Sequence, residues 1–277
     1  MRQGIYIIMV VAFLLCQTAA TSQNPGTDVQ TKLAGLYDRL ISSRNDEEKL
    51  GINDSIRSLI GSYAASDTAI IHRFDKLRYL GQIVSPDKKV KIINWNLILE
   101  DQKSRYYCYI IHKPSRNKAG RICALEAEYR EEPADCGRFY HDSDWYGSLY
   151  YDIMPVKKSG IENWIILGID YGNQFITRKV IDVISFDEEG RLSLGRKWFV
   201  SDDDIKYREV FEYSSEAVMS LRFTGARSIV FDHLVPLSPG LKDSMQHYAP
   251  DYSYDAYYFK DGMWRFEQNV DIRNRKD

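Results

Sequence analysis

From about Leu77 to near the C-terminus, the chain is a succession of short apolar runs rich in β-branched and aromatic residues, separated by turn sequences. This pattern is typical of β-strands, since branched and aromatic side chains pack well on a pleated surface. The sequence predicts about a dozen strands, in the runs VKIINWNLIL, RYYCYIIHK, RICALEAEY, WYGSLYYDIMPV, NWIILGIDYG, RKVIDVISF, RLSLGRKWF, YREVFEY, AVMSLRF, RSIVFDHLV, YDAYYFK and MWRFEQNV.

The connections between these runs are short, as in SPDK, KKSG and DEEG, and Asp261-Gly262 is a strong signal for a two-residue hairpin. Short connections favour antiparallel pairing of neighbouring strands, which makes a meander. We therefore predict a mainly β fold over residues 66–277, an antiparallel meander arranged as a sandwich, a barrel or a propeller. The runs repeat at no fixed period, which argues against a regular propeller.

The segment before these strands has apolar residues at helical spacing. Thr27 and Gln30 match a capping box, and Asn45 followed by Glu48 indicates a second helix start. We predict a pair of helices in an N-terminal helical segment, residues 23–65. Because the apolar stripes of the helices must be buried, we favour a helical cap on the β domain. The alternative is that the pair docks onto a separate protein.

The extreme N-terminus has the pattern of a secretory signal peptide: Arg2, an unbroken apolar run from Ile5 to Cys16, and then small polar residues. The apolar run is shorter than the roughly 20 residues of a membrane-spanning helix. We expect residues 1–22 to be cleaved before Gln23, which gives a periplasmic or secreted protein with no membrane span. A lipid anchor on Cys16 and an uncleaved N-terminal anchor are the alternatives.

Charge and cysteine content narrow the function classes. The 37 basic and 39 acidic residues nearly balance, so the chain has no basic excess that would hold a nucleic acid. Cys108 and Cys123 lie on two runs that form a predicted hairpin. In an exported protein, which meets an oxidising environment, these two cysteines can form a disulfide. The alternative is three buried free thiols, counting Cys136. The cysteine spacings include no C-x-x-C pair, so we expect no zinc site.

Two clusters of polar residues are candidate sites. Asp232 and His233 lie at the end of a predicted strand, where a base can face a loop. Neighbouring strand residues point to opposite faces, so these two are not expected to pair with each other. Asp251 and Asp255 flank Ser253 with the alternation seen in calcium loops, but the glycine and glutamate pattern of an EF-hand is lacking. The alternative is a turn in which aspartates cap the backbone.

Aromatic residues give a third candidate, because Trp145 and Tyr146 can stack on a sugar if they line a groove. The alternative is that these rings fill the core. Paired carboxylates on the sheet would then make a glycoside hydrolase. The candidates for that pair are Glu126, Glu128, Asp152, Asp170 and Asp182.

No motif of a serine hydrolase, a nucleotide-binding loop or a zinc protease occurs in the chain, and we predict no cofactor. The turn-and-strand segment SPDKKVKIINW and the run IVFDHLVP resemble segments of uncharacterised secreted proteins of Bacteroidota. This resemblance implies export and assigns no activity or site residue. We expect an exported non-catalytic binding or assembly protein of the periplasm or cell envelope, whose partner is an envelope protein or a glycan. The alternative is a carbohydrate-active or other hydrolase with its carboxylates on the sheet.

Overall fold

The structure, a computed structural model, describes residues 25–66, 68–100, 103–114, 120–158, 161–201 and 204–272. The predicted signal peptide, with Cys16, lies outside the described residues. Within these ranges two helices come first and sixteen strands in three sheets follow them, so the predicted fold class is confirmed. None of the sheets closes into a barrel within the described chain. No helix of this part of the chain is long and apolar enough to cross a lipid bilayer.

The helices are α1 (Pro25–Ser42) and α2 (Asp46–Ala64). The capping-box prediction at Thr27 is wrong, because α1 already begins at Pro25, where a first-turn proline costs no hydrogen bond. The prediction for α2 is confirmed. Asn45 is its N-cap and accepts a hydrogen bond from the backbone N–H of Glu48 at 2.9 Å.

The first sheet has the order β1-β2-β3-β4 and is antiparallel throughout. Residues 68–80, here called the connector, lie between α2 and β1, which is the edge strand of this sheet. The buried ammonium group of Lys91 holds the connector, since it donates to the carbonyls of Ala69 (2.9 Å) and His72 and to the hydroxyl of Tyr63 (3.1 Å). The strands are β1 (Gly81–Val84), β2 (Val90–Ile98), β3 (Ser104–His112) and β4 (Arg121–Ala127).

The second sheet has the order β5-β9-β8-β7-β6, and β12 pairs with the part of β8 that β9 leaves free. The third sheet has the order β11-β10-β16-β15-β14-β13. In it β10 and β16 are parallel, which departs from the predicted meander. The strands of the second sheet are β5 (Tyr140–His141), β6 (Leu149–Lys158), β7 (Ile161–Asp170), β8 (Ile176–Phe186), β9 (Leu192–Leu194) and β12 (Glu209–Ser214). Those of the third are β10 (Phe199–Ser201), β11 (Asp204–Lys206), β13 (Leu221–Gly225), β14 (Ser228–Pro236), β15 (Tyr248–Lys260) and β16 (Met263–Glu267).

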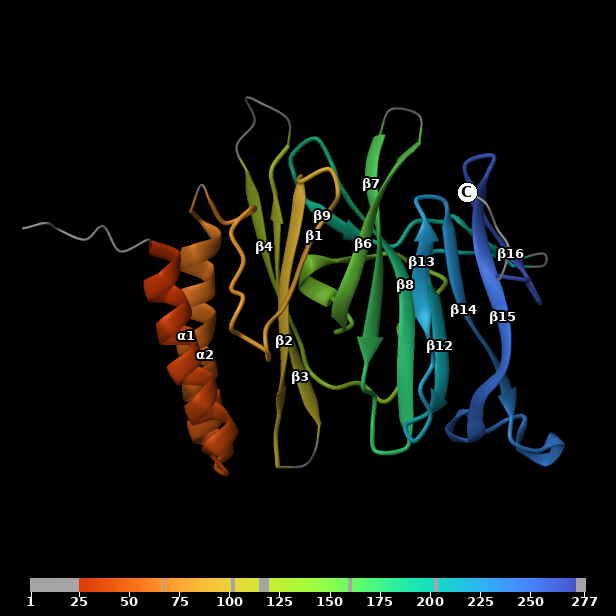
Figure 1. Ribbon diagram of the computed structural model, residues 1–277, viewed down its shortest axis with the longest axis horizontal. Coiled ribbons are helices and arrows are strands. Elements are labelled where there is room, and N and C mark those ends of the chain that lie inside the picture. The colour runs from red at the N-terminus through yellow and green to blue at the C-terminus, as the bar shows by residue number, and fades with distance from the viewer. Residues whose placement is uncertain are drawn as a thin grey trace, which may run out of the picture.

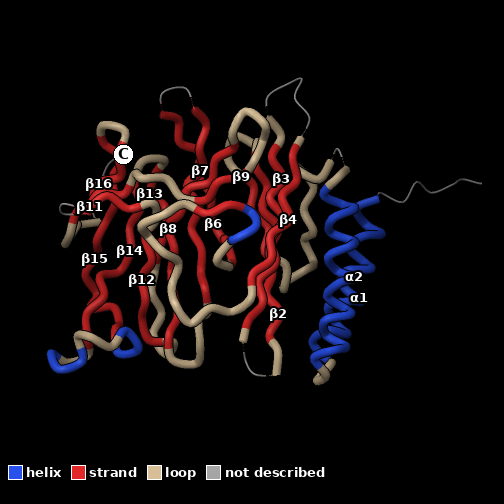
Figure 2. The backbone as a smooth tube through the Cα atoms, turned by 180° about the vertical axis from the view of Figure 1, so that it is seen from behind, coloured by secondary structure: helices blue, strands red, loops and turns tan. Residues whose placement is uncertain are grey.

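These elements form four layers: the helices, then the first, second and third sheets (Figure 1). The view from behind gives the same order (Figure 2). A separate apolar core fills each of the three interfaces. Ile56 and Ile60 of α2 share one buried apolar cluster with Trp95 of β2, so the helices cap the first sheet as the favoured interpretation predicts. The first sheet is thereby covered on both faces, which makes β2 almost wholly buried.

Candidate functional site

A groove of about 660 Å³ lies where the C-terminal end of α1, the connector and the adjoining edges of the first two sheets come together. Its walls come from α1, α2, the connector, β1, β2, β6, β7 and the residues just after β7. This volume falls within the range of about 300–1,000 Å³ that is usual for small-molecule sites.

An asparagine bridge joins the two sheets at the groove. The side-chain amide of Asn94 on β2 donates to the backbone carbonyl of Tyr150 on β6 at 3.1 Å. The opposing residue on β1 is Gly81, where a Cβ would lie only 2.9 Å from the same amide nitrogen. A glycine at this position therefore lets the edge strand and the bridging amide share the groove wall.

Five large apolar or aromatic residues line this groove and remain between 37% and 61% exposed, and we call them the apolar rim. They come from five separate segments of the chain. Exposed apolar residues scattered singly are normal, whereas a group of them around a hollow is typical of a binding site. The rim consists of Ile41, Tyr79, Ile98, Tyr151 and Tyr171.

Two of the rim tyrosines belong to segments that are fixed by hydrogen bonds. The hydroxyl of Tyr151 donates to the carbonyl of Leu221 on β13 at 2.9 Å, and Lys179 lies 4.5 Å from its ring centroid. The backbone N–H of Tyr171 donates to the hydroxyl of Tyr106 at 3.0 Å. These parts of the rim are therefore pre-positioned by the sheets, which lowers the entropic cost of binding.

The charged side chains among the lining residues, Lys49 and Arg78, are both positive. The ammonium group of Lys49 donates to the carbonyl of Ile98 at 3.0 Å and lies 3.7 Å from Asp46. Arg78 is exposed and has no hydrogen-bond or ion-pair partner among the described residues. The hydroxyl of Tyr37 is buried and has no hydrogen-bond partner among the described residues. Burial raises the pKa of this hydroxyl. None of the described lining residues is Asp, Glu, His or Cys.

A second hollow has a volume of about 450 Å³. Its lining residues include Glu100 and Gly172, which follow the rim residues Ile98 and Tyr171 closely in the chain. Its other acid, Glu131, accepts hydrogen bonds from Tyr129 and from the amide of Asn173 (3.0 Å). That carboxylate is engaged within the protein. This hollow therefore offers no second free acid opposite Glu100 among the described lining residues.

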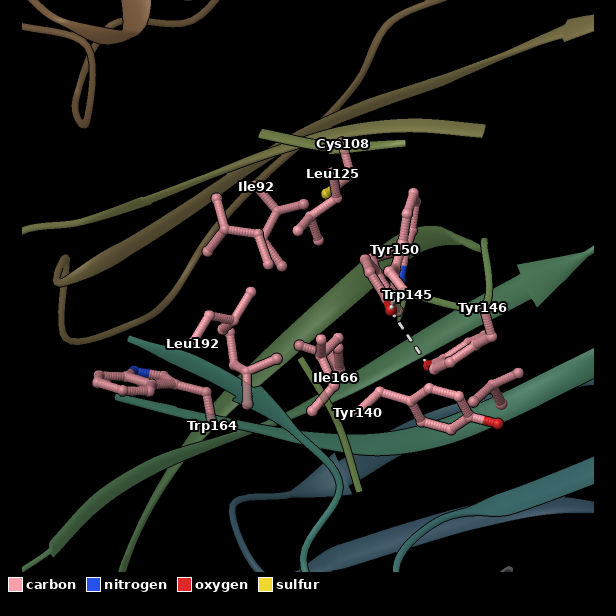
Figure 3. Close-up of a cluster of buried hydrophobic side chains, with 14 of the residues drawn as sticks. Ile92, Cys108, Leu125, Tyr140, Trp145, Tyr146, Tyr150, Trp164, Ile166 and Leu192 are labelled. Carbon is pink, nitrogen blue, oxygen red and sulfur yellow. Dashed lines mark hydrogen bonds between the residues drawn. The ribbon is translucent and has the colours of Figure 1, made fainter. Parts of the chain in front are cut away.

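Trp145 and Tyr146 lie in the core between the first and second sheets, at 1% and 7% exposure, as the core-filling alternative predicts. They belong to a buried chain of hydrogen bonds, of which Figure 3 shows the link between Tyr150 and Tyr146. The indole N–H of Trp145 donates to the Tyr150 hydroxyl (2.8 Å), this hydroxyl donates to that of Tyr146 (3.1 Å), and Tyr146 donates to Asp182 (2.8 Å). Asp182 also pairs with buried Arg208 at 2.9 Å. Neither ring of the predicted pair has a face open to a sugar.

His233 pairs across the third sheet with Asp255, at 2.7 Å between Nδ1 and Oδ2. Asp232 instead accepts a hydrogen bond from the backbone N–H of Ser220 at 2.7 Å, so the expected absence of an Asp232–His233 pair is confirmed. Asp255 is buried and also accepts from the backbone N–H of Asn269 at 3.1 Å. The pairing of β14 with β15 shifts its register between Asp232 and Leu234, on either side of His233. None of these side chains lines the groove.

Asp251 accepts hydrogen bonds from both the backbone N–H (2.9 Å) and the hydroxyl (2.6 Å) of Ser253, which hold its pKa below the usual value. This is the capping turn that the alternative interpretation predicts. The oxygens of Asp255 are engaged by His233 and Asn269 instead. No group of three or more metal-ligating side chains occurs in the described ranges.

The five carboxylates considered for hydrolysis lie outside the groove. Burial raises the pKa of Asp152, which accepts from the backbone N–H of Ile153 at 2.9 Å. The other four each pair with an arginine: Glu126 with Arg57 (2.9 Å), Glu128 with Arg105 (3.0 Å), Asp170 with Arg178 (3.1 Å) and Asp182 with Arg208 (2.9 Å).

The predicted disulfide between Cys108 and Cys123 is absent, and Cys136 is free as well. The strand register explains this difference. Cys108 on β3 pairs with Leu125, and Cys123 on β4 pairs with Ile110, so the two thiols occupy diagonal positions. Diagonal neighbours lie about 7–8 Å apart, beyond the usual span of a disulfide. Burial raises the pKa of Cys123 to about 11, which keeps this thiol protonated.

Comparison of the chain with known protein families, with curated proteins and with solved structures found no match. The site therefore rests on its own geometry. Sequence reasoning missed all five rim residues and Arg78. The only available signal for the rim was its apolar character, which it shares with the residues of the core, and Arg78 is one of many exposed charged residues.

Proposed function

We propose that this is an exported, non-catalytic binding protein of the periplasm or cell envelope, which holds a small ligand with an apolar body in the groove. The observation that carries the proposal is the apolar rim. Five partly exposed large residues from separate segments line one hollow of about 660 Å³. Burying such side chains against a ligand is favourable by about 25 cal/mol for each Å² of apolar surface removed from water.

The chemistry of the lining favours binding over hydrolysis. General acid–base catalysis needs a titratable group within reach of the substrate. The described lining residues include no carboxylate, imidazole or thiol, and the ammonium group of Lys49 is engaged by Ile98 and Asp46. The strand carboxylates that a hydrolase would use lie elsewhere. Export is supported by the signal-peptide pattern of residues 1–22.

The binding proposal is tested with N-phenyl-1-naphthylamine, an uncharged fluorescent probe that brightens in apolar sites. We expect saturable binding at one probe per chain. Tyr79→Ala and Tyr171→Ala should each weaken it roughly threefold or more, because each removes a rim ring. Tyr252→Ala is the matched control, since Tyr252 is 94% exposed and does not line the groove. Non-saturable binding, or an equal effect of all three substitutions, would contradict the proposal.

Two further measurements concern the natural setting. Native mass spectrometry of the protein purified from its own envelope fraction should reveal a bound small molecule. A stoichiometric protein partner without any small ligand would favour an assembly role instead. N-terminal sequencing of the exported chain tests the localisation, with Gln23 expected as the first residue; a chain that still begins with residues 1–22 would refute cleavage.

A further inference from the structure

We propose that the ligand of the groove is an anionic amphiphile, a free single-chain carboxylic acid, whose carboxylate is bound by Arg78 and the hydroxyl of Tyr37. This inference rests on the proposed function and specifies its ligand. It is argued from the charge of the lining, from a buried hydroxyl of a lining residue that has no partner among the described residues, and from the engagement of the lining amides.

The charge of the lining selects an anion. Its charged residues are Lys49 and Arg78, and no acidic residue is among the described lining side chains. Lys49 is partly neutralised by Asp46 at 3.7 Å. Arg78 has no such partner among the described residues, so its guanidinium is available to a ligand. A guanidinium offers a planar pair of donors that matches a carboxylate.

Tyr37 on α1 also lines the groove. Tyr37 is only 4% exposed, and its hydroxyl finds no partner among the described residues. A buried hydroxyl without a partner is costly, so such a group in a groove wall indicates a missing acceptor. The ring of Tyr37 contacts the ring of Tyr79, with 6.3 Å between centroids, and Tyr79 is the chain neighbour of Arg78. Since burial raises the pKa of Tyr37, the hydroxyl keeps its proton and can donate it to a carboxylate oxygen.

The remainder of the wall suits an acyl chain better than a sugar. Leu40, Leu97, Leu149 and Ile169 line it together with the apolar rim. The two amide side chains present are already engaged: that of Asn94 donates to the Tyr150 carbonyl, and that of Asn96 donates to the Ser104 hydroxyl at 3.3 Å. A sugar would leave many hydroxyls without partners on such a wall, whereas an acyl chain needs none.

The test compares two fluorescent probes with the same polyene chain, cis-parinaric acid and its methyl ester. We expect the wild-type protein to bind the acid roughly fivefold more tightly than the ester, the size expected of one partly exposed ion pair. Arg78→Gln should remove most of this preference by lowering the affinity for the acid, and should leave the affinity for the ester unchanged. Arg73→Gln is the matched control, because Arg73 is an exposed connector arginine that does not line the groove.

Tyr37→Phe gives an independent check, since it removes only an unpartnered hydroxyl and should leave thermal stability equal or higher. It should weaken binding of the acid and spare the ester. Equal binding of acid and ester by the wild-type protein overturns the ligand class while leaving the binding function intact. Absence of binding of both probes refutes the binding function itself. If Arg78→Gln weakens both probes equally, Arg78 only shapes the groove and the carboxylate site is refuted.

Discussion

His112 on β3 offers a direct test of how the core between the first two sheets is stabilised. Its ring is only 8% exposed and stacks on Phe186, with 4.0 Å between ring centroids, while Trp164 meets it edge-on at 5.5 Å. Neither ring nitrogen has a hydrogen-bond partner among the described residues. We predict that His112→Phe stabilises the protein, by about 1–3 kcal/mol, because it removes two buried unpaired polar atoms.

The same residue should make stability depend on pH. Burial lowers the pKa of His112 from 6.5 to about 4, against a smaller opposing effect of Glu162. Between these two values the unfolded chain binds more protons than the folded chain, so stability falls as the pH falls from about 6.5 to about 4. The shift corresponds to about 3 kcal/mol at most, since one pKa unit is about 1.4 kcal/mol. His112→Phe should abolish this part of the acid loss.

The assay is urea unfolding followed by tryptophan fluorescence, at about pH 8 and at about pH 5. The quantity of interest is the difference between variant and wild type at each pH, because carboxylates common to both proteins cancel. The variant's advantage should grow at the lower pH. His141→Phe is the control, since His141 is an exposed histidine on β5. An advantage that does not change with pH, or a loss of stability at about pH 8, would refute the reasoning.

Three other substitutions test buried contacts, each by urea unfolding. Asp182→Asn should cost about 3–5 kcal/mol, because it leaves the fully buried guanidinium of Arg208 without its counter-charge; a cost under about 1 kcal/mol would disprove a net role for the pair. Lys91→Met should cost about 2–3 kcal/mol by leaving connector carbonyls unpaired, and protease cleavage should then begin in the connector rather than in the sheets. Gly168→Ala should cost about 1–3 kcal/mol, since its Cβ would lie 2.4 Å from the hydroxyl oxygen of Ser148, and adding Ser148→Ala should recover part of the loss.

Local signals in the sequence predicted the hairpins well. Asp261 and Gly262 adopt φ angles of 51° and 75°, and the flanking residues Lys260 and Met263 pair as predicted for a two-residue turn. The run RLSLGRKWF was predicted as one strand and is two, β9 and β10. Gly195 has a φ of 100° between them, and there the chain leaves the second sheet for the third. A glycine inside an apolar run marks such a break, but its direction depends on contacts far away in the sequence.

The pairing of His233 with Asp255 shows a second feature that the sequence alone did not predict. His233 and Asp255 were each candidate site residues, but strand alternation alone predicted no partner for either of them. The contact arises because β14 and β15 pair with Asp255 opposite Phe231, two residues before His233, and a register shift follows directly after Asp232. Register shifts of this kind follow from the packing of whole strands rather than from the local pattern.

The groove could not be predicted from the sequence for a related reason. A strand that is covered on both faces appears in the sequence as a nearly continuous apolar run, as β2 does. Ile92 in the middle of that run is fully buried and Ile98 at its end is 56% exposed, although the run gives both the same apolar character. What separates them is the extent of the helical layer and of the second sheet over each end of the strand. Exposed apolar residues therefore become informative only when the layers are known, and the rim gathers where three of those layers meet.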